Sequence, residues 1–381
     1  MTEKLYYTDP FLKEFTATVL SCEQGKNGWA VTLNRTAFYP EGGGQPTDFG
    51  MLGDAHVTDV REKEGVILHT CDKELQVGAA VTGTIDWARR FDHMQQHSGE
   101  PIVSGIICAR YGCDNVGFHM GKDVVTIDFN YDIDPADLPS IEAQANGFIW
   151  GDTPIDIRFL EGEALQQAEY RSKKFIPGVV RLVAFPGADC CACCGTHVLR
   201  AGQVGLIKLL SCQKFREGVR IELLCGKRAV DYLSGTWEQN LAVSRALSAK
   251  PMQTAAAVER LQGELESVKL RCAALETADC ARKAQEYAGK GDVLLFDGDM
   301  SADSVRRLCD AVLDKCGGRC AVFAGEDGNY KYAVGIREGD VRPLVKELNA
   351  ALNGRGGGKP NFAQGSVAAD AAAIKAFFQD K

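Results

Sequence analysis

The sequence has no apolar run that approaches the roughly 18 residues needed to cross a membrane. Its first residues, MTEKLYYTDPF, contain acidic side chains and lack the apolar core of a secretory signal, so we expect a cytoplasmic protein. An excess of basic residues is also missing: 43 Lys and Arg stand against 51 Asp and Glu, a net charge of -8. This balance argues against a protein that grips nucleic acid over its whole surface, and it leaves room for local basic patches.

Histidine is scarce and cysteine is abundant, with 6 and 15 residues respectively. Cytosolic thiols are kept reduced, so clustered cysteines there are more often metal ligands or reactive groups than disulfides. Most of the cysteines are scattered, which suits small buried hydrophobic residues. One cluster stands apart: DCCACCGTHV, residues 189–198, has four cysteines within five consecutive positions, followed by a histidine.

The length of 381 residues exceeds that of a single-core domain and predicts a multidomain protein of mixed α/β and α+β class. Residues 1–88 alternate apolar and polar positions and predict a small β-barrel. Residues 89–226 mix helix and strand patterns and predict an α+β domain. A helix is predicted near residues 87–112, where we expect Gly99 and Pro101 to interrupt it.

The amino-acid composition of residues 227–381 differs from that of the preceding part of the chain. Residues 227–290 predict a helical linker, and residues 291–381 predict a separate small α/β domain that contains the stretch NGRGGGKPNFAQGS. Apolar residues in the second linker helix are spaced three and four apart, which favours a coiled-coil seam, although an ordinary amphipathic helix against a domain fits equally well. The seam residues are Val258, Leu261, Leu265, Val268, Cys272 and Leu275.

Two short-range pairs predict a metal site. Cys193 and His197 have C-x-x-x-H spacing, and His93 and His97 have H-x-x-x-H spacing. Two histidines four residues apart share one helix face, and a mixed set of Cys and His ligands suits zinc. The alternative is that the histidines lie on a solvated helix face and that the cysteines are structural.

Four longer stretches carry a resemblance: TAFYPEGGGQPTDFG (36–50), HSGE (97–100), CCGTHV (193–198) and GRGGGKPNFAQG (354–365). The first three resemble the signature blocks of the alanyl-tRNA synthetase editing domain and its freestanding relatives, the AlaX trans-editing proteins. The fourth resembles the glycine-rich signature of the synthetase's C-terminal DHH-associated domain. The blocks follow the family order over nearly the whole chain, which implies the long form of AlaX.

The resemblance implies a β-barrel, a zinc-dependent editing domain, a helical linker and a C-terminal tRNA-binding domain. The family hydrolyses the ester of serine, and also of glycine, wrongly attached to tRNA for alanine. The resemblance therefore implies an ATP-independent aminoacyl-tRNA hydrolase with tRNA for alanine as its partner and one zinc ion per chain. We also expect the linker or the C-terminal domain to leave room for a homodimer.

One residue departs from the family pattern. The family's helix motif H-S/T-x-x-H begins here at His97 and calls for a histidine at position 101, where this sequence has Pro101, which cannot bind a metal. His93 lies one helical turn away, about 5.4 Å along the axis, whereas a zinc ligand bond is only about 2.0 to 2.3 Å long. We therefore expect His93 to be an outside candidate only. The favoured zinc ligands are His97, Cys193 and His197, with water, Cys194 or another neighbouring cysteine in the fourth position.

Other site residues take their roles from the resemblance. The Thr and Gln of the first block line the family's pocket, which makes Thr36 and Gln45 catalytic candidates, and a threonine hydroxyl can select serine over alanine. His119 is a lower-ranked candidate for the same pocket. For the glycines of the fourth block, contact with tRNA is favoured over a flexible loop. The candidate tRNA-binding residues are Arg171, Lys173, Lys174, Lys227, Arg228, Arg355, Gly356, Gly357, Gly358, Lys359 and, for stacking, Phe362.

Three functions are compatible with the sequence. The first is a trans-editing hydrolase that deacylates mischarged tRNA for alanine. The second is a catalytically weakened or inactive tRNA-binding protein, because Pro101 replaces the expected zinc-ligand histidine. The third is a structural or redox cysteine cluster with no role on tRNA.

Overall fold

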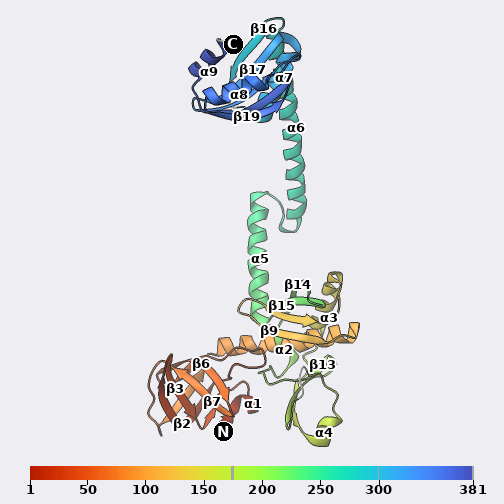
Figure 1. Ribbon diagram of the computed structural model, residues 1–381. Coiled ribbons are helices and arrows are strands. Elements are labelled where there is room, and N and C mark those ends of the chain that lie inside the picture. The colour runs from red at the N-terminus through yellow and green to blue at the C-terminus, as the bar shows by residue number, and fades with distance from the viewer. Residues whose placement is uncertain (173–175, 299, 380–381) are drawn as a thin grey trace. The chain divides into compact units, whose positions relative to one another are not determined.

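The computed structural model describes residues 1–172, 176–298 and 300–379. The chain divides into two compact units, Met1–Asn240 and Leu241–Lys381 (Figure 1). The division into four segments expected above stays a prediction. A search of the described helices finds none that is long and apolar enough to cross a bilayer.

The N-terminal part of the first unit is an antiparallel sheet that closes on itself, because β8 pairs with β2 as well as with β5. Alternation places one face of each strand inside, where Val31, Leu33 and Ile67 are fully buried. In spatial order the barrel strands are β2 (Glu14–Gly25), β3 (Gly28–Leu33), β7 (Val66–Cys71), β6 (Ala55–Lys63), β5 (Gly50–Leu52) and β8 (Ala80–Ile85). The short elements beside it are β1 (Glu3–Lys4), α1 (Leu5–Thr8) and β4 (Arg35–Thr36).

Helix α2 (Trp87–Tyr111) follows the barrel and forms much of the next hydrophobic core. The Asp86 side chain caps its first turn, and Gly112 ends it in the left-handed conformation with φ 62°. The helix runs through Gly99 and Pro101 without a break, so the expected interruption is wrong. Gly99 is needed for close packing, because a Cβ there would lie 2.1 Å from the sulfur of Cys225. Burial on nearly all sides stabilises the helix where local propensity is poor.

Two further antiparallel sheets complete the first unit (Figure 1). The sequence NVGFHMGKDVVTIDF, residues 115–129, is typical of a hairpin, and LPSIEAQANGFIW, residues 138–150, is typical of a helix. The structure confirms both. One sheet has the order β14 (Ile207–Phe215), β15 (Gly218–Cys225), β10 (Val125–Phe129), β9 (Asn115–Met120), and the other β11 (Asp156–Leu160), β12 (Val180–Phe185), β13 (Asp189–Ala192). The helices are α3 (Leu138–Trp150) and α4 (Gly162–Gln166), with short 3-10 turns at Pro135–Asp137 and Ala201–Val204.

The second unit is a five-stranded sheet with a hydrophobic core on each face. Alternation along β17 explains this: Cys320 and Val322 enter the core beside α7, and Ala321 and Phe323 enter the core beside α8. In spatial order the strands are β16 (Gly291–Asp297), β17 (Gly317–Glu326), β18 (Asn329–Gly335), β20 (Phe362–Val367) and β19 (Gly354–Lys359). The helices are α7 (Ala302–Cys316), α8 (Arg342–Ala351) and α9 (Ala371–Gln379).

Two long helices occupy the predicted linker. They are α5 (Gly226–Ala246) and α6 (Thr254–Glu286), with a 3-10 turn at Pro251–Gln253 between them. All six seam side chains on α6 are exposed to solvent, and the coiled coil stays a prediction. The exposed seam residues are Val258, Leu261, Leu265, Val268, Cys272 and Leu275.

A buried ion pair joins α2 to the barrel. Arg90 is fully buried, and its Nε lies 2.9 Å from Oδ2 of Asp48. The same guanidinium donates to the carbonyl oxygen of Pro10 at 3.0 Å and also to the carbonyl of Ala37. The backbone N–H of Tyr39 donates to the same Asp48 oxygen at 2.7 Å. Several hydrogen bonds thus stabilise a pair of charges that water does not reach, and all those to the Asp48 carboxylate use Oδ2, since Oδ1 has no hydrogen-bond partner within the described residues.

Removing one partner of this pair should destabilise the first unit strongly. We expect Asp48→Ala to lower its free energy of unfolding by about 3–5 kcal/mol, because Arg90 is left as an unpaired buried charge. Urea unfolding followed by tryptophan fluorescence measures this unit alone, since Trp29, Trp87, Trp150 and Trp237 all lie in Met1–Asn240. The control is Lys73→Ala, which breaks an exposed pair and should change little. Equal effects of the two substitutions would contradict the prediction.

The barrel core also contains an uncharged histidine. His69 is fully buried, its Nδ1 donates to the carbonyl of Val31 at 3.1 Å, and its Nε2 therefore accepts from the Thr36 hydroxyl at 2.9 Å. Burial lowers the pKa of His69 from 6.5 to about 4.

The first unit should lose stability as the pH falls from about 6.5 toward 4, because the unfolded chain binds a proton at His69 before the folded chain does. At pH 5 the loss due to His69 is about 2 kcal/mol. The unfolding free energy should be measured at pH 7 and pH 5 for the wild type and for His69→Gln. Other buried histidines contribute in the same direction, so the difference between the two proteins isolates His69. An identical pH dependence in both would refute this assignment.

Candidate metal centre

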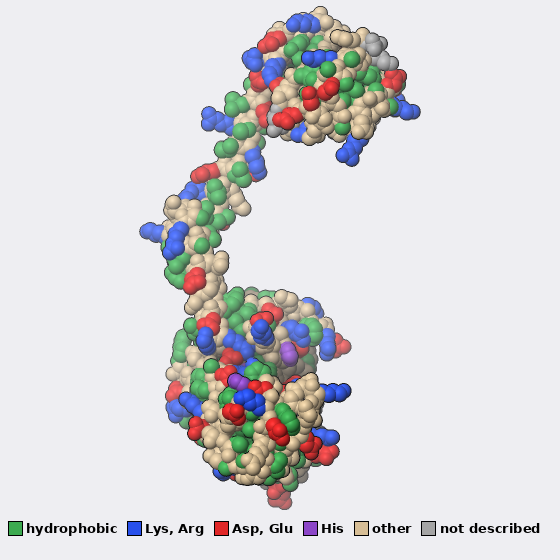
Figure 2. All heavy atoms as spheres, turned by 90° about the vertical axis from the view of Figure 1, so that its left-hand side faces the viewer, with side chains coloured by type: hydrophobic (Ala, Val, Ile, Leu, Met, Phe, Trp, Pro, Cys, Tyr) green, Lys and Arg blue, Asp and Glu red, His purple; other side chains and the backbone are tan. Residues whose placement is uncertain are grey.

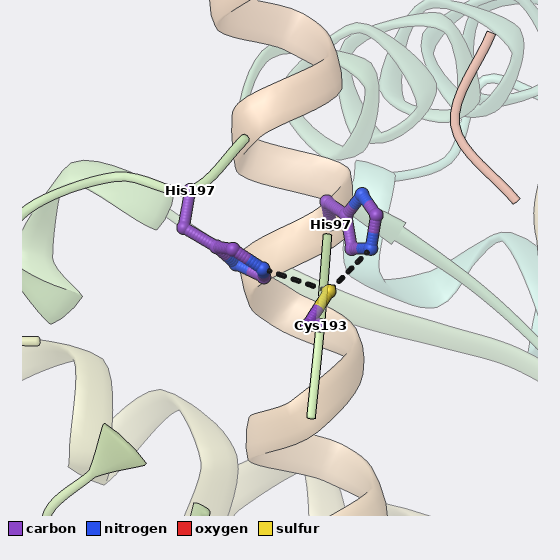
Figure 3. Close-up of side chains that lie close together, drawn as sticks. All are labelled: His97, Cys193 and His197. Atoms are coloured by element: carbon purple, nitrogen blue, oxygen red, sulfur yellow. Dashed lines mark hydrogen bonds between the residues drawn. The ribbon is translucent and has the colours of Figure 1, made fainter. Parts of the chain in front are cut away.

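Three side chains from distant parts of the sequence meet in the first unit (Figure 3). His97 comes from the middle of α2, and Cys193 and His197 come from the loop after β13. The Nε2 of His97 lies 3.3 Å from the Cys193 sulfur, and the Nε2 of His197 lies 3.2 Å from it. All three potential ligand atoms lie within 4.8 Å of one another. The structure thus brings together the three residues expected to bind zinc.

Neighbouring polar groups orient both imidazole rings. The Oε1 of Gln45 accepts from Nδ1 of His97 at 2.8 Å, which leaves the lone pair of Nε2 facing the sulfur. Thr196 in turn holds the side chain of Gln45. The backbone N–H of Thr196 donates to Oε1 of Gln45 at 3.1 Å, and the Thr196 hydroxyl accepts from the side-chain amide of Gln45 at 2.9 Å. On the other side, Nδ1 of His197 lies 3.2 Å from the Ser98 hydroxyl. Metal-binding histidines are commonly held in this way by partners of the second ring nitrogen.

Burial favours the uncharged forms of Cys193 and His197. Burial raises the pKa of Cys193 to about 12, and burial together with His97 lowers the pKa of His197 well below its ordinary value. A neutral thiol therefore faces two imidazole nitrogens, and the thiol must lose its proton when a cation binds. Two imidazole nitrogens and one sulfur that converge on one point fit zinc, and a set of three protein ligands leaves one position open.

His93 does not belong to the group of ligands found among the described residues, so its role as an outside candidate is not supported. It lies one helical turn before His97, too far along the axis for a ligand bond. The side chain is buried, and its Nδ1 has no hydrogen-bond partner within the described residues. Burial, followed by the charges of Arg89 and Arg228, lowers the pKa of His93 to about 3.

The glycine-rich loop packs directly against the cluster. Gly43 and Gly44 have φ values of 58° and 83°, which favour glycine. A Cβ at Gly43 would lie 2.8 Å from the Cys194 sulfur, and one at Gly44 would lie 2.6 Å from the Phe118 ring. Cys194 is exposed, and its sulfur lies 3.8 Å from the hydroxyl of Tyr39. Cys194 is therefore outside the ligand group found in the described chain.

The two catalytic candidates occupy different positions. Gln45 contacts His97 directly, as described above. The Thr36 hydroxyl instead bonds His69 in the barrel core and accepts from the backbone N–H of Phe38 at 3.1 Å. His119 is exposed on β9, opposite Thr126 of β10. Of these three, only Gln45 has a hydrogen bond to the cluster within the described residues.

Sequence reasoning missed several residues that support the site. Ser98 and Thr196 directly precede or follow expected ligands, so their positions were a usable signal. Arg181 gave no such signal: its guanidinium donates to the carbonyl oxygens of Cys193 and Gly195 at 2.7 and 3.0 Å and fixes the ligand loop. Gly195 permits close packing, because a Cβ there would lie 2.0 Å from the His97 ring.

The candidate tRNA-binding residues fall into three groups. Lys173 and Lys174 lie outside the described residues, and Arg171 is paired with Asp189, with 2.9 Å between Nε and Oδ1. Lys227 and Arg228 begin α5 and pair with Asp231 and Asp92. The residues 355–359 form most of the edge strand β19, so the flexible-loop alternative is wrong. Phe362 is partly buried against the core beside α7, which limits stacking on a base.

Three protein-family models match the chain. Residues 4–89 match "tRNA synthetases class II (A)", residues 180–222 match "Threonyl and Alanyl tRNA synthetase second additional domain", and residues 289–380 match "DHHA1 domain". The alanyl-tRNA editing protein AlaX-L of Pyrococcus horikoshii is 29% identical, over 97% of this chain and 95% of that protein. The chain is related to the AlaX-type alanyl-tRNA editing proteins.

Alanine–tRNA ligases are also similar to the chain. Those of Pyrococcus abyssi and Halorubrum lacusprofundi are 32% and 33% identical, over 96% of this chain in both cases. The chain spans 42% of the length of each ligase. The similarity to AlaX-L, by contrast, extends over nearly all of both proteins.

Zinc affinity should depend on the three ligand residues and on the residues that orient them. We expect Cys193→Ala to abolish stoichiometric zinc binding, and Ser98→Ala to lower zinc affinity about 10–100-fold because His197 loses its orienting partner. The measurement is a zinc titration of reduced protein against a competing chelator. Cys190→Ala is the matched control, since Cys190 lies on β13 outside the ligand group. A loss of zinc in the control equal to that in Cys193→Ala would instead support a general cysteine cluster.

Proposed function

We propose that the chain is a zinc-dependent hydrolase that removes serine, and also glycine, from mischarged tRNA for alanine. The convergence of His97, Cys193 and His197, with both Nε2 atoms directed at one sulfur, is the observation that carries the proposal. The similarity to an alanyl-tRNA editing protein along nearly its full length supports the substrate class. The reaction is hydrolysis of the ester between the amino acid and the terminal ribose.

A zinc ion held by these three residues would supply Lewis acidity or lower the pKa of a water molecule. The chain's own residues prepare the site for it. Gln45 keeps the proton of His97 on Nδ1, and Ser98 holds the ring of His197. Arg181 fixes the backbone that carries Cys193. These contacts preorganise the site, which reduces the conformational entropy that is lost when a ligand binds.

Thr36 stays a candidate for bonding a serine hydroxyl, although its own hydroxyl already bonds His69. For the tRNA, the proposal requires local contacts, since Lys and Arg alternate with Asp and Glu over the face shown in Figure 2. The exposed edge strand β19, with Arg355 and Lys359, offers one such surface.

A deacylation assay tests the proposal directly. Full-length protein should release serine from tRNA for alanine at least about tenfold faster than alanine, because a bond to the serine hydroxyl is worth roughly 1.4 kcal/mol or more. Cys193→Ala should lose this activity, and Cys190→Ala should retain it. Zinc content must be determined on the same preparations. Bound zinc with no release of serine would contradict the proposed function.

Pro101 favours a second candidate, a weakened or inactive protein that binds tRNA, because it occupies the expected place of a further ligand on α2. Pro101→His separates the two candidates. Higher zinc affinity and faster serine release in this variant would identify the wild type as weakened. An unchanged rate would mean that three protein ligands suffice. Absence of both zinc and activity in the wild type, with tRNA still bound in a gel-shift experiment, would establish the second candidate.

A further inference from the structure

A pocket lined by charged side chains lies in the first unit, with a volume of about 440 Å³. It is formed by the start of α2, the turn between β9 and β10, and the first turns of α5. Its charged lining residues are Arg89, Lys122, Lys227, Arg228, Asp92 and Asp231.

The cations in this pocket are only partly neutralised. Arg228 is bonded to Asp92 at 2.6 Å, and Lys227 is bonded to Asp231 at 2.5 Å. Arg89 donates to the carbonyl of Thr47 at 2.9 Å, and neither Arg89 nor Lys122 has an ion pair within the described residues. The lining of the pocket has four basic side chains against two carboxylates, an excess of positive charge on a chain whose net charge is -8. A concave site of this kind attracts anions.

The pocket adjoins the metal cluster through two segments. His93 lines the pocket one helical turn before His97, a step of about 5.4 Å. Pro46 also lines it and directly follows Gln45, the partner of His97. The turn between β9 and β10 is tied to the pocket as well, because Arg228 donates to the carbonyl of Gly121 at 2.8 Å. A ligand whose ester lies at the cluster can thus reach the pocket with its nearest anionic group.

We propose that this pocket binds a phosphate of the terminal nucleotide of the acylated RNA and so positions the ester at the metal cluster. The inference rests on the proposed function and extends it to a specific contact. Arginine and lysine are the usual partners of phosphate oxygens, and such contacts fix register without reading the base. Arg228 is already held in place by Asp92 and Gly121, so the pocket keeps its shape without a ligand.

Two small esters that differ by one phosphate test the inference. Full-length zinc-loaded protein should hydrolyse 3′-O-seryl-AMP with a kcat/KM about tenfold higher than 3′-O-seryl-adenosine, since one bond between charged groups is worth that much. Lys122→Glu should bring this ratio close to one. The matched control is Lys26→Glu, an exposed lysine in the turn between β2 and β3 that does not line the pocket, and it should keep the wild-type ratio.

The outcomes separate the two proposals. Equal hydrolysis of both esters by the wild type would overturn the phosphate site and leave the proposed function standing. If neither ester is hydrolysed, deacylation of charged tRNA decides the proposed function, and calorimetric binding of AMP and adenosine decides the pocket. Tighter binding of AMP that Lys122→Glu removes would support the phosphate site. Equal or undetectable binding of AMP and adenosine, or inorganic phosphate that binds as tightly as AMP, would overturn it.

Discussion

The buried pair of Arg90 and Asp48 sets the relation between α2 and the glycine-rich loop, and the candidate site depends on that relation. Arg90 lies two turns before His97 on the helix, and Asp48 lies three residues after Gln45 in the loop. Fixing these two points places the Gln45 side chain 2.8 Å from Nδ1 of His97. A charge pair without water also tolerates little displacement, because any shift leaves an unpaired charge in a medium of low polarity. The barrel therefore serves as the support for a histidine on another element.

The second constraint is burial around α2. A proline and a glycine near the ligand histidine would weaken an isolated helix, yet α2 continues through both. The close approach of Cys225 to Gly99 shows why glycine is required there. At Pro101 the same burial excludes water, and the helix keeps His97 in register with the loop that carries Cys193 and His197. The proline therefore does not break the helix, and it places a residue that cannot bind a metal one turn after His97.

The polar groups of the site are arranged as layers around the three ligands. Gln45 and Ser98 contact the imidazole rings, and Thr196 and Arg181 hold those contacts or the loop itself. Beyond them lies the pocket with an excess of basic side chains, which contrasts with the acidic balance of the whole chain. The net charge of the chain therefore does not determine which ions a single concave surface attracts, because salt screens charges that lie more than about 10 Å away.

The sequence alone determined the local elements and the three candidate ligands. The helix at 138–150, the hairpin at 115–129 and the trio of His97, Cys193 and His197 follow from periodicity, turn residues and motifs that act over short stretches of chain. Only the tertiary structure decided the continuity of α2, the position of Thr36 in the barrel core, the edge strand at 354–359 and the support from Arg181. Several of the contacts that hold the site join residues distant in sequence: Thr36 and His69 are 33 residues apart, and Gln45 and His97 are 52 residues apart. Packing rather than local pattern selects such contacts.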